Sequence, residues 1–165
     1  MIWKSCKLAA LFVLATICHW GFATLFSYVD LNVNMMLVFA IAFCTIAKLE
    51  ISYPFVFLCG LFLDFFGIKL FGNNAFLFTL VACTVIFLRE RIDFSAVIPQ
   101  VITVFLLSCA VGFLNSVLLF WFTSSALWPG LWSLVGGALV GALLSPAVFW
   151  LIRQTWKTPL KQEYE

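Results

Sequence analysis

The sequence predicts an all-α polytopic membrane protein in which about six transmembrane helices form one compact bundle. Its composition is the first reason, since 65% of the 165 residues are hydrophobic and only 10% are charged. A soluble domain carries roughly a quarter charged residues. The second reason is that long apolar runs recur along the chain, close to the roughly 20 residues that span a bilayer. The connections between these runs are short, so we expect one transmembrane domain, 1–165, without a soluble domain.

The first predicted span is 8–29, and the second is 33–47. The first follows Lys4 and Lys7 and looks like a secretion signal at its start. Its cleavage site is poor and its apolar run is long enough to cross, so we expect an uncleaved first helix. The second span is short and is closed by Lys48.

The segment 54–88 holds two shorter predicted spans, 54–71 and 75–89. A turn signal, Gly72-Asn73-Asn74, separates them. A re-entrant hairpin that enters and leaves the bilayer on the same side is the alternative for this segment.

The last two predicted spans are 96–122 and 131–152. Both are long and strongly apolar. The polar segment 153–165 then forms a tail.

Lysine and arginine residues gather on one side of the predicted bundle. Six spans place eight of the nine basic residues together: Lys4, Lys7, Lys48, Arg89, Arg91, Arg153, Lys157 and Lys161. Only Lys69 falls on the other side. Because basic loops stay in the cytoplasm, we predict a multi-pass protein with both termini and the tail 153–165 in the cytoplasm. The sequence has no basic patch with interleaved aromatic residues, so no nucleic-acid partner is expected.

Asp64 interrupts an apolar run of leucines and phenylalanines. A carboxylate near the bilayer centre costs about 2.5–3.5 kcal/mol, so this side chain needs hydrogen-bond donors. Counting residues from the predicted outer surface places Asn115 at the same depth, roughly 12 Å down. Asn73 and Asn74 are nearer competitors, and His19 is slightly deeper. We interpret Asp64 mainly as a structural or assembly residue, with ligand or ion binding as the alternative.

Patterns for catalysis, metals and cofactors are missing from the sequence. An intramembrane aspartyl protease needs two carboxylates that share a proton, whereas only Asp64 is buried in the predicted bilayer. A metal site needs clustered ligands, and His19 is the single histidine. The six cysteines form no CxxC pair, and we interpret them as small hydrophobic residues. We therefore predict a protein that is not an enzyme, with no catalytic residue, metal ligand or cofactor.

Small residues recur every four positions in the last span, at Ser133, Gly137, Gly141 and Ser145. Such a face lets two helix backbones approach closely. We expect its partner inside the bundle rather than in another protein. Gly60 gives the third span its own close-contact position.

Gly60, Asp64 and the glycine-marked turn at Gly72 are followed by the apolar run FLFTLVACTVIFL. Together with six spans and cytoplasmic termini, this arrangement resembles the MreD family of bacterial rod shape-determining membrane proteins. The resemblance implies a fold similar to the substrate-binding subunits of energy-coupling-factor transporters. It also implies a non-enzymatic inner-membrane component of the cell-elongation complex, or elongasome, which controls cell shape.

The resemblance further implies an MreC-like single-span partner, and through it MreB, RodA and a penicillin-binding transpeptidase of peptidoglycan synthesis. The lipid bilayer is the other partner. The expected structural or partner-binding residues are Gly60, Asp64, Gly72, Asn115, Gly137 and Gly141.

Two alternative functions remain open on the sequence. One is the substrate-binding membrane subunit of a vitamin-type small-molecule transporter, for which the sequence offers few polar residues to line a pocket. The other is an ion- or proton-coupled carrier that uses Asp64 and His19.

Overall fold

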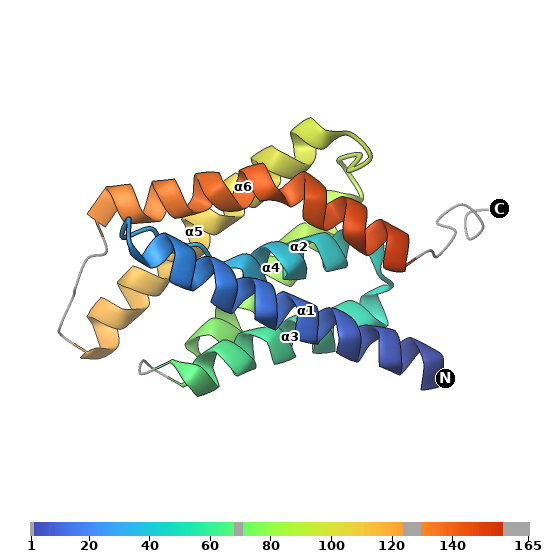
Figure 1. Ribbon diagram of the computed structural model, residues 1–165, viewed down its shortest axis with the longest axis horizontal. Coiled ribbons are helices and arrows are strands. Elements are labelled where there is room, and N and C mark those ends of the chain that lie inside the picture. Colours follow the sequence, from blue (N-terminus) through green and yellow to red (C-terminus); the bar gives the residue numbers. More distant parts are fainter. Residues whose placement is uncertain (1, 68–70, 124–129, 157–165) are drawn as a thin grey trace.

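The computed structural model describes residues 2–67, 71–123 and 130–156, and these ranges contain helices but no strand. Six helices follow one another along the chain (Figure 1): α1 Ile2–Ser27, α2 Met35–Ile46, α3 Leu49–Phe66, α4 Asn73–Arg89, α5 Val97–Thr123 and α6 Gly130–Thr155. Within this described part, α1, α3, α5 and α6 are long and apolar enough to cross a membrane. The prediction of a helical membrane protein is confirmed at this level.

The bounds of α3 differ most from the prediction. The helix begins at Leu49, five residues before the predicted start, and the carbonyl of Lys48 accepts the amide hydrogens of Ile51 and Ser52. Backbone hydrogen bonds of a helix do not require apolar side chains, so α3 extends toward the N-terminus beyond its apolar run. At the other end Gly67 is extended, with φ −83° and ψ 140°, and α3 finishes at Phe66.

Some predictions fall on residues outside the described ranges. These are the positions of Lys69, Lys157 and Lys161 and the part of the tail from 157 to 165.

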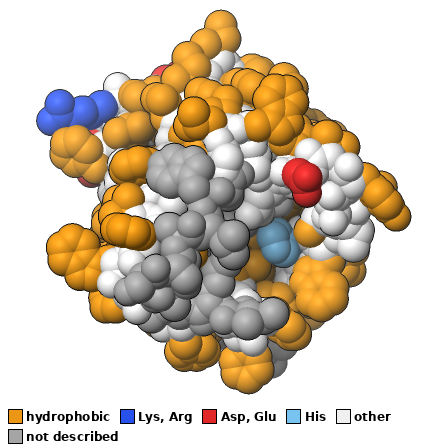
Figure 2. Space-filling model, turned by 90° about the vertical axis from the view of Figure 1, so that its left-hand side faces the viewer, with side chains coloured by type: hydrophobic (Ala, Val, Ile, Leu, Met, Phe, Trp, Pro, Cys, Tyr) orange, Lys and Arg blue, Asp and Glu red, His pale blue; other side chains and the backbone are white. Residues whose placement is uncertain are grey.

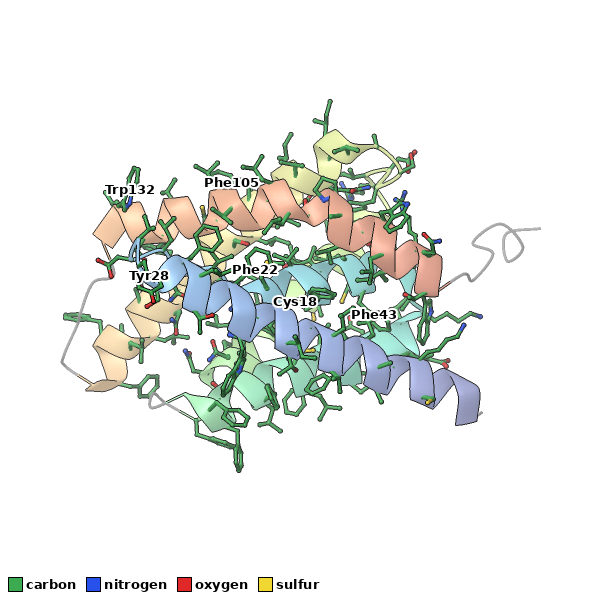
Figure 3. The ribbon with its side chains drawn as sticks, viewed as in Figure 1. Cys18, Phe22, Tyr28, Phe43, Phe105 and Trp132 are labelled. Carbon is green, nitrogen blue, oxygen red and sulfur yellow. The ribbon has the colours of Figure 1, made fainter. Side chains whose placement is uncertain are left out.

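The short helix α2 lies at the centre of the molecule. All 12 of its residues are buried, and it packs against the other five helices. Its sequence is apolar on every side, as expected of a helix with no polar surroundings. Phe43 of α2, which Figure 3 labels, contacts Phe55 of α3 and Trp156. The ring centroids lie 4.4 and 5.2 Å away, respectively. The longer helices therefore surround α2 and form the core with it.

Consecutive helices run in opposite directions along the long axis of the molecule (Figure 1). One end, which we call the basic end, holds the starts of α1, α3 and α5 and the finishes of α2, α4 and α6. There Arg89 donates to the carbonyl oxygen of Ala47, 2.8 Å away, just after α2. Arg153 donates to the carbonyl of Phe94, between α4 and α5. These arginines satisfy carbonyl groups that the helices and loops leave unpaired.

Candidate functional site

The carboxylate of Asp64 hydrogen-bonds to the first turn of α4. The residue is only 5% exposed. Its Oδ1 accepts from the backbone N–H and the side-chain amide of Asn74, at 2.9 and 3.0 Å. Its Oδ2 accepts from the backbone N–H of Ala75 at 2.9 Å. Because the first N–H groups of a helix lack partners within it and favour a negative charge, Asp64 and α4 satisfy each other.

Gly72 explains why this carboxylate comes from the neighbouring helix. It precedes α4 with φ +91°, a left-handed conformation that suits glycine, and it has no side chain to cap the helix. Asp64 supplies the oxygen that a serine or aspartate normally supplies from the N-cap position.

Gly60 brings the backbones of α3 and α4 into contact. A Cβ atom at Gly60 would lie 2.6 Å from the Cα of Ala75 and 2.7 Å from the carbonyl oxygen of Asn74. Only glycine allows this approach, which places Asp64, one turn later, within reach of the same two residues.

The polar contacts continue from α4 to α5. The side-chain amide of Asn73 donates to Oδ1 of Asn115. Of the amides considered for Asp64, Asn74 is therefore its partner, while Asn115 bonds to Asn73. These four side chains, which we call the polar network, join α3, α4 and α5 near the end opposite the basic end.

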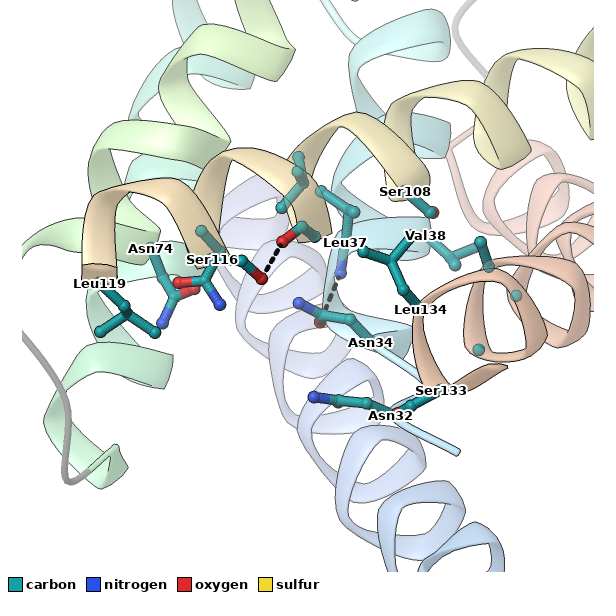
Figure 4. A pocket seen from close by; sticks show the side chains of 16 residues that line it. Asn32, Asn34, Leu37, Val38, Asn74, Ser108, Ser116, Leu119, Ser133 and Leu134 are labelled. Atoms are coloured by element: carbon teal, nitrogen blue, oxygen red, sulfur yellow. Dashed lines mark hydrogen bonds between the residues drawn. The ribbon is translucent and has the colours of Figure 1, made fainter. Parts of the chain in front are cut away.

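A polar cavity of about 130 Å³ lies beside the polar network (Figure 4). Its side-chain amides come from Asn32, Asn34, Asn74 and Asn115, and its hydroxyls come from Ser108, Ser116 and Ser133. Aliphatic side chains of α2, α5 and α6 complete the walls. The expectation that the chain has few polar residues to line a pocket is wrong, because the fold gathers them from four separate segments.

One signal for this cavity is visible on α5. Ser108, Gly112, Asn115 and Ser116 recur at steps of three and four residues and so share one helix face. Of these four residues of α5, depth counting along the sequence identifies only Asn115, because it compares depths in the membrane and not faces of a helix.

The small-residue face of α6 packs against α2 and the segment before it. A Cβ atom at Gly137 would lie 2.3 Å from the carbonyl oxygen of Asn32. One at Gly141 would lie 3.3 Å from Cγ2 of Val38. The close partner of this face is therefore internal, and Gly137 also forms part of the cavity wall.

His19 stands apart from the polar network. Its Nδ1 is buried and has no hydrogen-bond partner among the described residues. The side chain lines a hollow of about 430 Å³ with Trp20 and Thr24 of α1 and Phe62 of α3. Figure 2, which views the end opposite the basic end, shows the single histidine inside this hollow.

An apolar groove of about 700 Å³ continues from the hollow between α1 and α3. Its walls carry the aliphatic and aromatic side chains Leu8, Ala9, Phe12 and Val13 of α1 and Phe55, Leu58, Leu61, Phe62, Phe65 and Phe66 of α3. Leu58 and Phe65 are 51% and 76% exposed. We call this surface the α1–α3 groove.

Among the described residues, no three His, Cys, Asp or Glu side chains form a group that could hold a metal ion. Comparisons of the chain with models of protein families, with curated proteins and with solved structures found no match. The candidate functional features of the molecule are therefore the α1–α3 groove, the polar cavity and the polar network.

Proposed function

We propose that this protein is a non-enzymatic inner-membrane component of the bacterial rod-shape, or cell-elongation, complex. In this role it binds the membrane anchor of an MreC-like partner. Through that partner it helps to couple MreB filaments to RodA, a penicillin-binding transpeptidase and peptidoglycan synthesis, as the resemblance to the MreD family implies. The α1–α3 groove is the observation that carries the proposal.

The groove has the properties that a transmembrane anchor needs. Helices associate in lipid through close van der Waals packing, because lipid chains are as apolar as the side chains themselves. None of the described residues that line the groove is charged, so a helix can enter without desolvating a charge there. Its exposed aromatic side chains offer large contact areas to such a helix.

The proposal includes six crossings, both termini in the cytoplasm and a fold similar to the substrate-binding subunits of energy-coupling-factor transporters. The alternating helix directions and the basic end support this orientation. With 12 residues α2 is about 18 Å long, so the segments beside it must complete its passage through a core of about 30 Å.

Filling the groove tests the proposal. We expect Leu58→Trp to reduce copurification of the MreC-like partner from native membranes at least about tenfold, which corresponds to about 1.4 kcal/mol. Leu143→Trp is the matched control, since Leu143 is an exposed leucine of α6 outside the groove. A photo-crosslinker at position 58, but not at 143, should also capture the partner. Equal copurification with both variants would contradict this role.

The polar cavity favours a second candidate function, the substrate-binding membrane subunit of a vitamin-type transporter. This function requires a small molecule bound in about one copy per protein and an ATPase module in the same complex. Mass spectrometry of gently purified protein would detect both. An adaptor should instead carry lipid and its shape-complex partners.

A further inference from the structure

The polar cavity offers several hydrogen-bonding groups that the fold does not use. Oδ1 of Asn34 accepts from the N–H of Leu37, and Oδ1 of Asn115 accepts from Asn73, so both amide NH₂ groups remain as donors. The amide NH₂ of Asn74 donates to Asp64, which leaves its oxygen as an acceptor. Figure 4 labels Asn34 and Asn74 beside the cavity.

Three further side chains in the lining have no hydrogen bond within the part of the chain that the structure describes. The side chains of Asn32, Ser108 and Ser133 form none with other described residues. In contrast, Ser116 donates to the carbonyl of Gly112 in its own helix. The cavity therefore presents both donors and acceptors, held on four segments of a packed bundle.

Lipid cannot satisfy these groups, because acyl chains neither donate nor accept hydrogen bonds. A polar group without a partner in apolar surroundings costs several kcal/mol. Water or a polar solute must therefore occupy the space. The volume of about 130 Å³ is close to that of the cavity of about 150 Å³ in which a protein holds benzene.

The charge of the lining restricts the chemistry of such a solute. None of the described lining residues is charged, and the carboxylate of the polar network, Asp64, already accepts three hydrogen bonds from α4. An ion would enter without a counter-charge and would lose its hydration. Leu37, Val111 and Leu134 supply apolar contacts beside the amides.

We propose that this cavity binds a small uncharged molecule, about the size of one aromatic ring, through a carboxamide or hydroxyl group. Asn32 is exposed and connects the cavity to the surface at the end opposite the basic end. The proposal does not depend on the α1–α3 groove, and it holds for an adaptor as well as for a transport subunit.

A set of probes of equal size but different charge tests the proposal on the full-length protein in detergent. We expect benzamide or benzyl alcohol to raise Tm in a saturable way, and benzoate and benzylammonium to leave Tm unchanged. Ser108→Leu should abolish the shift by filling the cavity, and Ser108→Ala should weaken apparent binding at least about threefold. The control Thr84→Leu, on a half-buried position of α4 outside the lining, should keep the shift.

Three results would overturn the proposal: no saturable shift with either neutral probe, an equal shift with a charged probe, or a shift that survives in Ser108→Leu. Because Leu58→Trp leaves the cavity intact, it should lose the MreC-like partner and keep the shift. The failure of one proposal is thus separable from the failure of the other.

Discussion

Asp64 illustrates how a single carboxylate is accommodated in an apolar bundle. Its insertion costs about 2.5–3.5 kcal/mol, whereas each hydrogen bond to a charged group contributes about 1.5–3 kcal/mol. Asp64 accepts three such bonds, and two of the donors are backbone N–H groups that need an acceptor in any case. The cost is therefore offset within the molecule, and the favoured role of Asp64 is to hold α4 against α3.

The variant Asp64→Ala should lower the free energy of unfolding by about 2–4 kcal/mol, because it leaves the part-buried N–H of Asn74 and the buried N–H of Ala75 unpaired. Asp64→Asn keeps one acceptor oxygen and should lose less. Thr84→Ala, which removes an exposed hydroxyl bonded within α4, should change stability by less than about 0.5 kcal/mol. Unfolding in mixed detergent measures these differences. Wild-type stability of Asp64→Ala together with loss of partner capture would instead indicate direct contact with the partner.

At the scale of elements, α3 and α4 form a tightly joined hairpin. Gly60 allows their backbones to touch, Gly72 begins the return, and Asp64 satisfies the start of α4. By contrast, α1 packs mainly on α2 and leaves the α1–α3 groove beside it. A rigid hairpin therefore forms one wall of the proposed docking surface, and an outer helix forms the other.

The variant Gly60→Ala tests this close approach. Its Cβ would meet backbone atoms, which cannot rotate away, so we expect a loss of about 1–3 kcal/mol in stability. Gly21→Ala is the control within α1, where a Cβ has nothing within 4 Å. That variant should be neutral or stabilising by up to about 1 kcal/mol. Equal effects in the same unfolding assay would show that α3 and α4 do not touch at Gly60.

For the whole molecule, the basic end and the buried helix α2 set the arrangement of the bundle. Arg89 and Arg153 bond to carbonyls at this end, so the charges that orient a membrane protein also hold helix ends and loops together. Tyr28 and Trp132 lie at the opposite end, where aromatic side chains suit the membrane interface (Figure 3). Asn32, an exposed residue in the lining of the polar cavity, precedes α2 at that same end.

Cysteine labelling tests the proposed orientation. Tyr28 and Glu90 are exposed near opposite ends of the molecule. In spheroplasts, a membrane-impermeant maleimide should label Tyr28→Cys above the wild-type background. It should label Glu90→Cys only after permeabilisation, because the proposed orientation places the basic end in the cytoplasm. The reverse pattern would invert the orientation.

Much of the architecture could be predicted from local properties of the chain. Apolar runs in a bilayer must form helices that satisfy their own backbone, and each of the six helices overlaps one of the predicted ranges. The need of Asp64 for donors followed in the same way from the cost of burying a charge. Helix ends, such as the early start of α3, were less predictable because surface residues also continue a helix.

The sequence by itself determined that this protein is helical, apolar and suited to a membrane, since these properties are sums over neighbouring residues. Only the tertiary structure decided that α2 lies at the centre, that Asn74 rather than Asn115 bonds to Asp64, and that Asn32, Ser108 and Ser133 share a cavity. Grooves, cavities and hydrogen-bond partners depend on which faces of distant segments meet, and close packing of the whole bundle sets that choice.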